Sequence, residues 1–183
     1  MSTNLEPYIW PTSFACTLVT DKILLPNHYT ITVGIDPVDP VYFSLGFRRL
    51  KAFIDLYLHN SIFILQNHDL VESILKLETN TVKLPTDPYD HVVGCILLRK
   101  FQSITYKYFE IEHITIDSAI GDNVQYCIRD PEETGLELSG EQWWNNDNLD
   151  TGKGMLISWT DLELQDGPKF EPRIVKGGRS ENK

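Results

Sequence analysis

A stripe of apolar residues at helical spacing, followed directly by a run of β-forming residues, constrains the fold of this chain most. The run 61–65 is apolar on both faces, which is typical of a strand covered on both sides. Asp39-Pro40 predicts that the helix begins at Pro40, and His59-Asn60 that it ends before the strand. The stripe has the i, i+3, i+4, i+7 pattern of an amphipathic helix and consists of Phe47, Leu50, Phe53, Ile54, Tyr57 and Leu58.

Two more helices are expected in the middle of the chain. Asn67 can cap the first of them, which would run to about Lys76. Asp87-Pro88 repeats the signature of a helix start, with Asp90 adding negative charge in the first turn. An apolar stripe follows, so we predict a third helix over about residues 88–103.

Short β-forming runs flank these helices. Two strands are expected over 14–20 and 29–35, with a turn at Pro26-Asn27 between them. A hairpin is expected from residue 104 to Ile128, with its turn over 117–122. The apolar positions change parity near Glu112-His113, which predicts a β-bulge there. A last strand is expected over about 155–164.

Together these elements predict an α+β fold with a mixed or mainly antiparallel sheet of about six strands and about three helices packed on it. The length of 183 residues fits one domain, which we place at 1–166, followed by a flexible basic C-terminal tail over 167–183. Within the domain, residues 130–153 lack an apolar period and form an unusually long loop, which is typical of a functional or disordered segment.

The charge is strongly uneven along the sequence. Residues 1–109 hold ten acidic and nine basic side chains, whereas residues 110–166 hold fourteen acidic and two basic ones, Arg129 and Lys153. Nonspecific affinity for nucleic acid comes from Lys and Arg, so no direct nucleic-acid binding is expected. A basic protein is the expected partner of the acidic 110–166 region.

The expected cellular compartment is inferred from patterns that the sequence lacks. No run approaches the roughly 18 apolar residues of a membrane span, and no secretory signal pattern opens the chain, so we expect a cytoplasmic protein that does not bind membranes. Cys16, Cys95 and Cys127 are widely spaced, which argues against a disulfide framework or zinc site, and we expect all three to be buried. No cofactor is expected.

Catalytic candidates come from histidines near carboxylates, since no familiar catalytic motif is present. Asp87 and His91 are four residues apart and could share a helix face as an acid-base pair, although a cap and a first-turn charge explain Asp87 and Asp90 equally well.

His113 gives the second candidate set. If it faced Asp122 across the hairpin, the carboxylate could orient it as a general base, with Asp117 nearby. Aspartates also satisfy backbone groups in turns, which is the alternative explanation.

The long loop contains Trp143 and Trp144 among acidic residues. Adjacent residues on a regular backbone cannot both enter one core without local distortion, so one tryptophan is expected to be exposed or to cover an edge of the fold. Tryptophan is enriched in interface hot spots. The expected partner-binding residues are Trp143, Trp144, Glu137, Glu141 and Asp147.

The oxygens of Asn146, Asn148 and Asp150 resemble a calcium loop only weakly, because the glycine is late and the final acidic ligand is missing, so no metal is expected. Arg48, Arg49 and Lys51 form a basic cluster. Docking of this cluster on the acidic region of a second copy would give a homodimer.

The leading functional prediction is a non-catalytic binding protein, such as an inhibitor, an immunity-type protein or an accessory factor, that engages a basic partner through residues 110–166. One alternative is a small hydrolase or nucleotide-handling enzyme that uses the His and Asp sets above, with or without a divalent metal. A second alternative is a structural subunit of a homo-oligomeric assembly.

Overall fold

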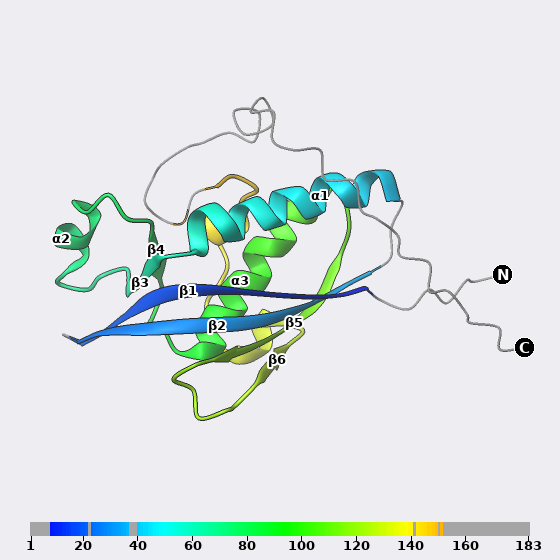
Figure 1. Ribbon diagram of the computed structural model, residues 1–183. Coiled ribbons are helices and arrows are strands. Elements are labelled where there is room, and N and C mark those ends of the chain that lie inside the picture. Colours follow the sequence, from blue (N-terminus) through cyan, green and yellow to red (C-terminus); the bar gives the residue numbers. More distant parts are fainter. Residues whose placement is uncertain (1–7, 22, 37–39, 141, 150, 152–183) are drawn as a thin grey trace, which may run out of the picture.

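The computed structural model of the protein describes residues 8–21, 23–36, 40–140, 142–149 and 151. In these residues one mixed six-stranded sheet of order β4-β3-β1-β2-β5-β6 carries three α-helices, which confirms the predicted α+β fold (Figure 1). The strands are β1 (Tyr8–Thr20), β2 (Ile23–Ile35), β3 (Ser61–Leu65), β4 (Thr81–Leu84), β5 (Ile111–Ser118) and β6 (Tyr126–Ile128). The helices are α1 (Pro40–Phe53), α2 (Val71–Leu75) and α3 (Asp90–Thr105). The predicted strand over about 155–164 and the tail 167–183 lie outside the described residues.

β1 and β2 form one long antiparallel hairpin of two 13-residue strands. The predicted turn at Pro26-Asn27 is wrong, because the chain reverses near Asp21, whose φ of 50° is a turn conformation. β5 pairs with β2 only from Tyr29 onward. The part of β2 that contains Pro26 is therefore a sheet edge, where strands tolerate proline.

The bulge predicted from the change of parity is present in β5. The residues opposite Gly34 and Ile35 of β2 are His113 and Ile111, and Glu112 between them has no partner. This extra residue lets the apolar positions on both sides of it face the same core. β6 then pairs antiparallel with β5, which confirms the hairpin, but its predicted start at residue 104 is wrong, because α3 continues to Thr105 and β5 begins at Ile111.

α1 begins at Pro40, as predicted. It continues into a π-helical turn, Ile54–Leu58, closed by a hydrogen bond of 2.9 Å from the His59 N–H to the Ile54 carbonyl. This wider turn keeps the apolar stripe of the helix on the core up to its last residue, since Ile54, Tyr57 and Leu58 are all buried.

The starts of α2 and α3 differ from the prediction. Leu70 is the N-cap residue of α2, so the predicted cap at Asn67 is wrong and the helix is only five residues long. α3 begins at Asp90 after the N-cap residue Tyr89, so the predicted capping role of Asp87 is also wrong. In the part of the chain that the structure describes, no helix is long and apolar enough to cross a membrane.

The core has a large and a small part on opposite faces of the sheet. α1 and α3 lie on one face (Figure 1), where they bury alternate residues of β1 and β2. On β3, Phe63 points into this large core, whereas Ile64 joins a small cluster with Val19 and Ile74 of α2. β3 is therefore covered on both faces and lies inside the sheet, as its apolar run predicts.

The chain after β6 crosses α3 and reaches the edge strand β4. It contains two short 3-10 helices, Pro131–Thr134 and Trp143–Asn145. The Thr151 carbonyl accepts a hydrogen bond of 3.1 Å from the Lys83 N–H, and the Thr151 hydroxyl donates to the Thr81 carbonyl at 2.8 Å. These contacts cover an edge that would otherwise offer unpaired backbone groups.

Candidate functional site

Trp143 and Trp144, the predicted anchors for a partner, lie inside the protein. Their exposed fractions are 6% and 1%, so neither is exposed. The 3-10 backbone and a ring angle of 79° let the two neighbours pack in one core. The Trp143 indole donates to the Lys83 carbonyl of β4 at 2.8 Å. Of the two predicted alternatives, the structure therefore shows the second, in which a tryptophan covers an edge of the fold.

A completely buried lysine supports this tryptophan pair. The Lys100 ammonium on α3 donates to the carbonyl oxygens of Trp143 at 2.9 Å, Asn146 at 3.0 Å and Asn148 at 2.6 Å. It also lies 3.3 Å from Asn146 Oδ1 and 5.6 Å from the ring centres of Phe53 and Trp143. Of the residues that weakly resemble a calcium loop, Asn146 and Asn148 thus direct oxygens at an ammonium group, and Asp150 lies outside the described residues.

The acidic residues predicted to contact a partner are accessible where the structure describes them. Glu137 is exposed. The Asp147 carboxylate is 3.6 Å from the Lys107 ammonium, and about two fifths of its side chain is exposed, at 42%. Glu141 lies outside the described residues.

His113, Asp117 and Asp122 are spread along the β5–β6 hairpin. His113 lies near the start of β5, about 14 Å from Asp117 at the usual rise of a strand, and Asp122 lies in the turn beyond. The Asp117 carboxylate instead accepts a hydrogen bond of 2.9 Å from Gln125. The structure does not bring His113 and Asp122 to face each other across the hairpin.

His91 and Asp87 do not share a helix face, because Asp87 precedes the first residue of α3. The His91 ring lies between two tyrosines, with centroid distances of 6.0 Å to Tyr89 and 5.9 Å to Tyr126. Over the described ranges, no group of three or more His, Cys, Asp or Glu residues is placed to hold a metal ion.

The basic cluster of α1 is partly used inside the molecule. The Arg49 guanidinium lies 5.1 Å from the centre of the Tyr108 ring, and the Lys51 ammonium pairs with Asp55 one turn later. Arg48 is exposed. Exposed ion pairs of this kind contribute little to stability.

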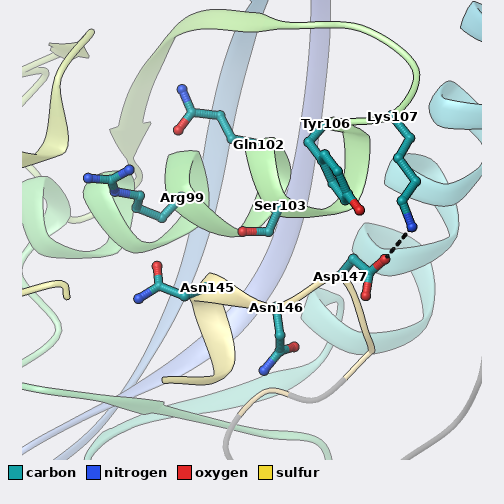
Figure 2. A pocket seen from close by; sticks show the side chains of 8 residues that line it. All are labelled: Arg99, Gln102, Ser103, Tyr106, Lys107, Asn145, Asn146 and Asp147. Atoms are coloured by element: carbon teal, nitrogen blue, oxygen red, sulfur yellow. Dashed lines mark ion pairs between the residues drawn. The ribbon is translucent and has the colours of Figure 1, made fainter. Parts of the chain in front are cut away.

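A polar cleft of about 660 Å³ lies between the last two turns of α3 and the loop that follows Trp144 (Figure 2). We call it the α3 cleft. Figure 2 shows Ser103 and Tyr106 facing the loop across the opening, with Lys107 reaching down to Asp147. The lining residues are Arg99, Gln102, Ser103, Tyr106, Lys107, Asn145, Asn146 and Asp147.

Hydrogen bonds fix both walls of the α3 cleft. On the helix wall, Gln102 donates to the Ile111 carbonyl at 3.0 Å, and Ser103 donates to the Trp144 carbonyl at 3.0 Å. On the loop wall, the Asn145 amide donates to two carbonyl oxygens of the preceding chain. The Tyr106 side chain, followed by Asp147, raises the pKa of Lys107.

The residues of the helix wall were not singled out by the sequence analysis. Arg99, Ser103, Tyr106 and Lys107 follow the spacing i, i+4, i+7, i+8, which marks the polar face of α3. That pattern could have shown that they lie side by side. It could not show that the loop 145–147 lies opposite them, because a solvated helix face has the same pattern.

A second feature is a group of exposed apolar side chains at the β5–β6 turn and the start of α3. Figure 1 shows this turn extending from the sheet on the side away from α1. Tyr89, Ile120, Val124 and Tyr126 are between 36% and 57% exposed. We call these four residues and His91 the tyrosine surface.

The turn beneath the tyrosine surface is held by polar contacts. The Gly121 N–H donates to the Ser118 carbonyl at 3.1 Å, and the Ser118 hydroxyl donates to the Asp90 carboxylate at 2.7 Å. A β-carbon on Gly121 would lie 2.5 Å from that carboxylate. The turn therefore sits tightly on the first residue of α3, which fixes the position of the exposed side chains.

Compared with known proteins, the sequence matches no protein-family model and no curated protein.

Proposed function

We propose that the protein is a non-catalytic binding factor that engages a basic protein through its acidic region. The class of function is the one the sequence suggests, with the contact residues moved from the buried tryptophans to the tyrosine surface. The observation that carries the proposal is that the exposed Tyr89 and Tyr126 flank the His91 ring, with the exposed Ile120 and Val124 in the turn that precedes Tyr126.

The chemistry of the tyrosine surface suits protein recognition. Tyrosine gives a large contact area with few torsions to immobilise, and it is enriched in the residues that dominate binding energy. Apolar side chains grouped on a surface and surrounded by polar ones are typical of an interface core with its rim.

The charge around the tyrosine surface favours a basic partner. Asp122 lies in the turn between Ile120 and Val124, and Asp117 follows Ile116, the partner of Tyr126, with its side chain on the other face of the hairpin beside Gln125. Both belong to residues 110–166, where fourteen acidic side chains stand against two basic ones. A surface of one sign accelerates encounter with a partner of the opposite sign.

The test begins with capture from a lysate of the native host, at about 50 mM and about 500 mM salt, followed by identification and purification of the captured protein. Its affinity is then measured directly for Tyr89→Ala/Tyr126→Ala. We expect the double substitution to weaken binding by about a hundredfold, as for loss of two interface anchors. Asp117→Asn/Asp122→Asn should slow association and reduce the salt dependence.

Tyr106→Ala is the matched control, since Tyr106 is 62% exposed and lies at the other end of α3, about 24 Å along the helix axis. It should bind the partner as the wild type does. Equal binding by the double tyrosine variant, or capture that does not change with salt, contradicts the proposal. The proposal is also contradicted if the only protein that binds the tyrosine surface is a second copy of this chain, which light scattering would show as a dimer.

A further inference from the structure

The α3 cleft has the size of a small-molecule site and lies apart from the tyrosine surface. Its volume of about 660 Å³ falls within the usual range of ligand pockets. Every residue that lines it is polar or, in Tyr106, carries a hydroxyl group. The carbon atoms of these side chains form nearly as much of the lining as their polar atoms do, so the cleft suits a ligand that carries many polar groups and some apolar faces.

Charge within the α3 cleft is already balanced. The Arg99 guanidinium pairs with Glu132 at the rim, and the Lys107 ammonium pairs with Asp147. A bound anion would lie close to the Glu132 or Asp147 carboxylate, and a bound cation close to Arg99 or Lys107, so the cleft favours neither sign of charge. A neutral ligand can use the donor and the acceptor of each pair without separating them.

Unused hydrogen-bonding capacity in the α3 cleft includes both donors and acceptors. Asn145 uses its amide nitrogen in two hydrogen bonds, and its carbonyl oxygen remains an acceptor. Ser103 donates to a backbone carbonyl, and its oxygen can still accept. The Lys107 ammonium has three N–H donors, more than its contact with Asp147 uses. Hydroxyl groups, which donate and accept at once, match such a mixture.

The walls of the α3 cleft are preorganised. One wall is the helix α3, and the opposite wall is held by the buried Lys100 ammonium through Asn146 and Asn148. A ligand that enters therefore orders little of the protein, which favours binding of small polar molecules. Figure 2 shows the Tyr106 ring beside the opening, with Lys107 on one side of it and Ser103 on the other.

We propose that the α3 cleft binds a neutral polyhydroxylated ligand, a saccharide. The Lys107 ammonium lies 5.0 Å from the centre of the Tyr106 ring, and the other face of the ring offers a flat surface to a sugar ring, while Asn145 and the two ion pairs take its hydroxyl groups. Binding at this cleft is independent of the proposed protein partner, because the two surfaces share no residue.

The test is a titration of the isotopically labelled full chain, followed by amide NMR shifts, with glucose, galactose, mannose, N-acetylglucosamine and their short oligomers. At least one sugar should shift the amides of α3 and of the loop 145–147. Tyr106→Ala should weaken that binding by about tenfold, while Tyr106→Phe, which keeps the ring, should weaken it less. Tyr89→Ala, at the other end of α3, should leave it unchanged.

Four other ligands are titrated in parallel. They are two anions, inorganic phosphate and the larger citrate, a cation, spermidine, and a peptide, tetra-alanine. Shifts at the α3 cleft with one of these and with no sugar overturn the proposal, as does a flat response to the whole sugar panel at millimolar concentrations. Sugar binding that Tyr106→Ala does not weaken also overturns it. None of these results bears on capture by the tyrosine surface.

Discussion

Lys100 shows how a single side chain can organise a loop. It lies on α3 between residues of the apolar stripe and is completely buried. Burying an ammonium group is costly unless hydrogen bonds replace water. The carbonyl oxygens of Trp143, Asn146 and Asn148 supply these bonds, so the loop and the lysine each satisfy polar groups of the other.

Lys100→Met tests this arrangement, because methionine has a similar length and no charge. The substitution leaves several buried carbonyl oxygens without donors, so we expect the free energy of unfolding to fall by about 3 kcal/mol or more. The α3 cleft should also open, which tryptophan fluorescence can report because Trp143 and Trp144 would gain exposure. Urea unfolding measures the stability.

Lys51→Met is the control for Lys100→Met. Lys51 is exposed and pairs with Asp55 along α1, so its replacement should cost only a few tenths of a kcal/mol. A wild-type urea midpoint and wild-type fluorescence in Lys100→Met would show that the ammonium does not hold the loop.

For single residues, the sequence shows which side chains are polar, but it does not show which groups they contact in the fold. Lys100 follows Val93 and Leu97 at the spacing of the buried stripe of α3. Its charge nevertheless argues for exposure. The carbonyl oxygens that allow its burial come from residues more than forty positions later, so no local pattern predicts it. The same long-range contacts bury Trp143 and Trp144, which local reasoning placed at an edge or in solvent.

Among the elements, α3 approaches the β5–β6 hairpin closely at Gly94. A β-carbon there would lie 2.3 Å from Ile128 Cδ1 and 2.9 Å from Ile116 Cγ2. Both distances are shorter than side chains tolerate. The glycine therefore sets how near the helix can come to the sheet beneath the tyrosine surface.

Gly94→Ala has two opposite effects on stability. Alanine favours the helix by about 1 kcal/mol, whereas crowding of a packed core costs about 1–3 kcal/mol. Because Ile116 is β-branched and cannot rotate its Cγ2 away cheaply, we expect a net loss of about 1 kcal/mol. Ile128→Val removes the nearer methyl group, so the double variant should lose less than the sum of the two single losses. Additive losses in urea unfolding would contradict the close approach.

Element positions were predictable where the signal is local. The bulge at Glu112 follows from parity alone, and the start of α1 follows from Asp39-Pro40. The predictions at Pro26 and Asn67 were wrong. Pro26 is a local turn signal that strand pairing overrides, and Asn67 is a local cap signal that packing overrides. The π-helical end of α1 has no signature in the spacing of apolar residues.

For the whole molecule, the sequence predicts the α+β class but not the strand order. β1 pairs in parallel with β3, which follows it after β2 and α1, and this pairing leaves no local pattern. The cover that Thr151 gives to β4 is non-local for the same reason. The α3 cleft forms between α3 and a loop about forty residues later, so it depends on this topology.

The interior also holds titratable groups that the whole fold keeps neutral. Burial, followed by the nearby Asp90 carboxylate, raises the pKa of Cys16 from 9.0 to about 12. The same two causes raise the pKa of Tyr29, and burial raises that of Cys95. Cys16 and Cys95 are buried, as expected, whereas Cys127 is exposed, which corrects the expectation that all three are buried.

Alkaline pH should therefore destabilise the folded protein. Above about pH 9 a thiol loses its proton in the unfolded protein but keeps it in the folded protein, where its pKa is raised to about 12. The stabilising contribution of the buried thiol is therefore fully present below about pH 9 and falls as the pH rises toward 12. Each such group contributes a slope of about 1.4 kcal/mol per pH unit in that window. Urea unfolding from pH 7 to about 10.5 should show a shallower decline for Cys16→Ala than for the wild type, because one titrating group is gone. In Cys127→Ala, which replaces the exposed cysteine, the free energy of unfolding should decline with pH as it does in the wild type. If the decline has the same slope in the wild type and in both variants, the buried Cys16 thiol is not a source of the pH dependence.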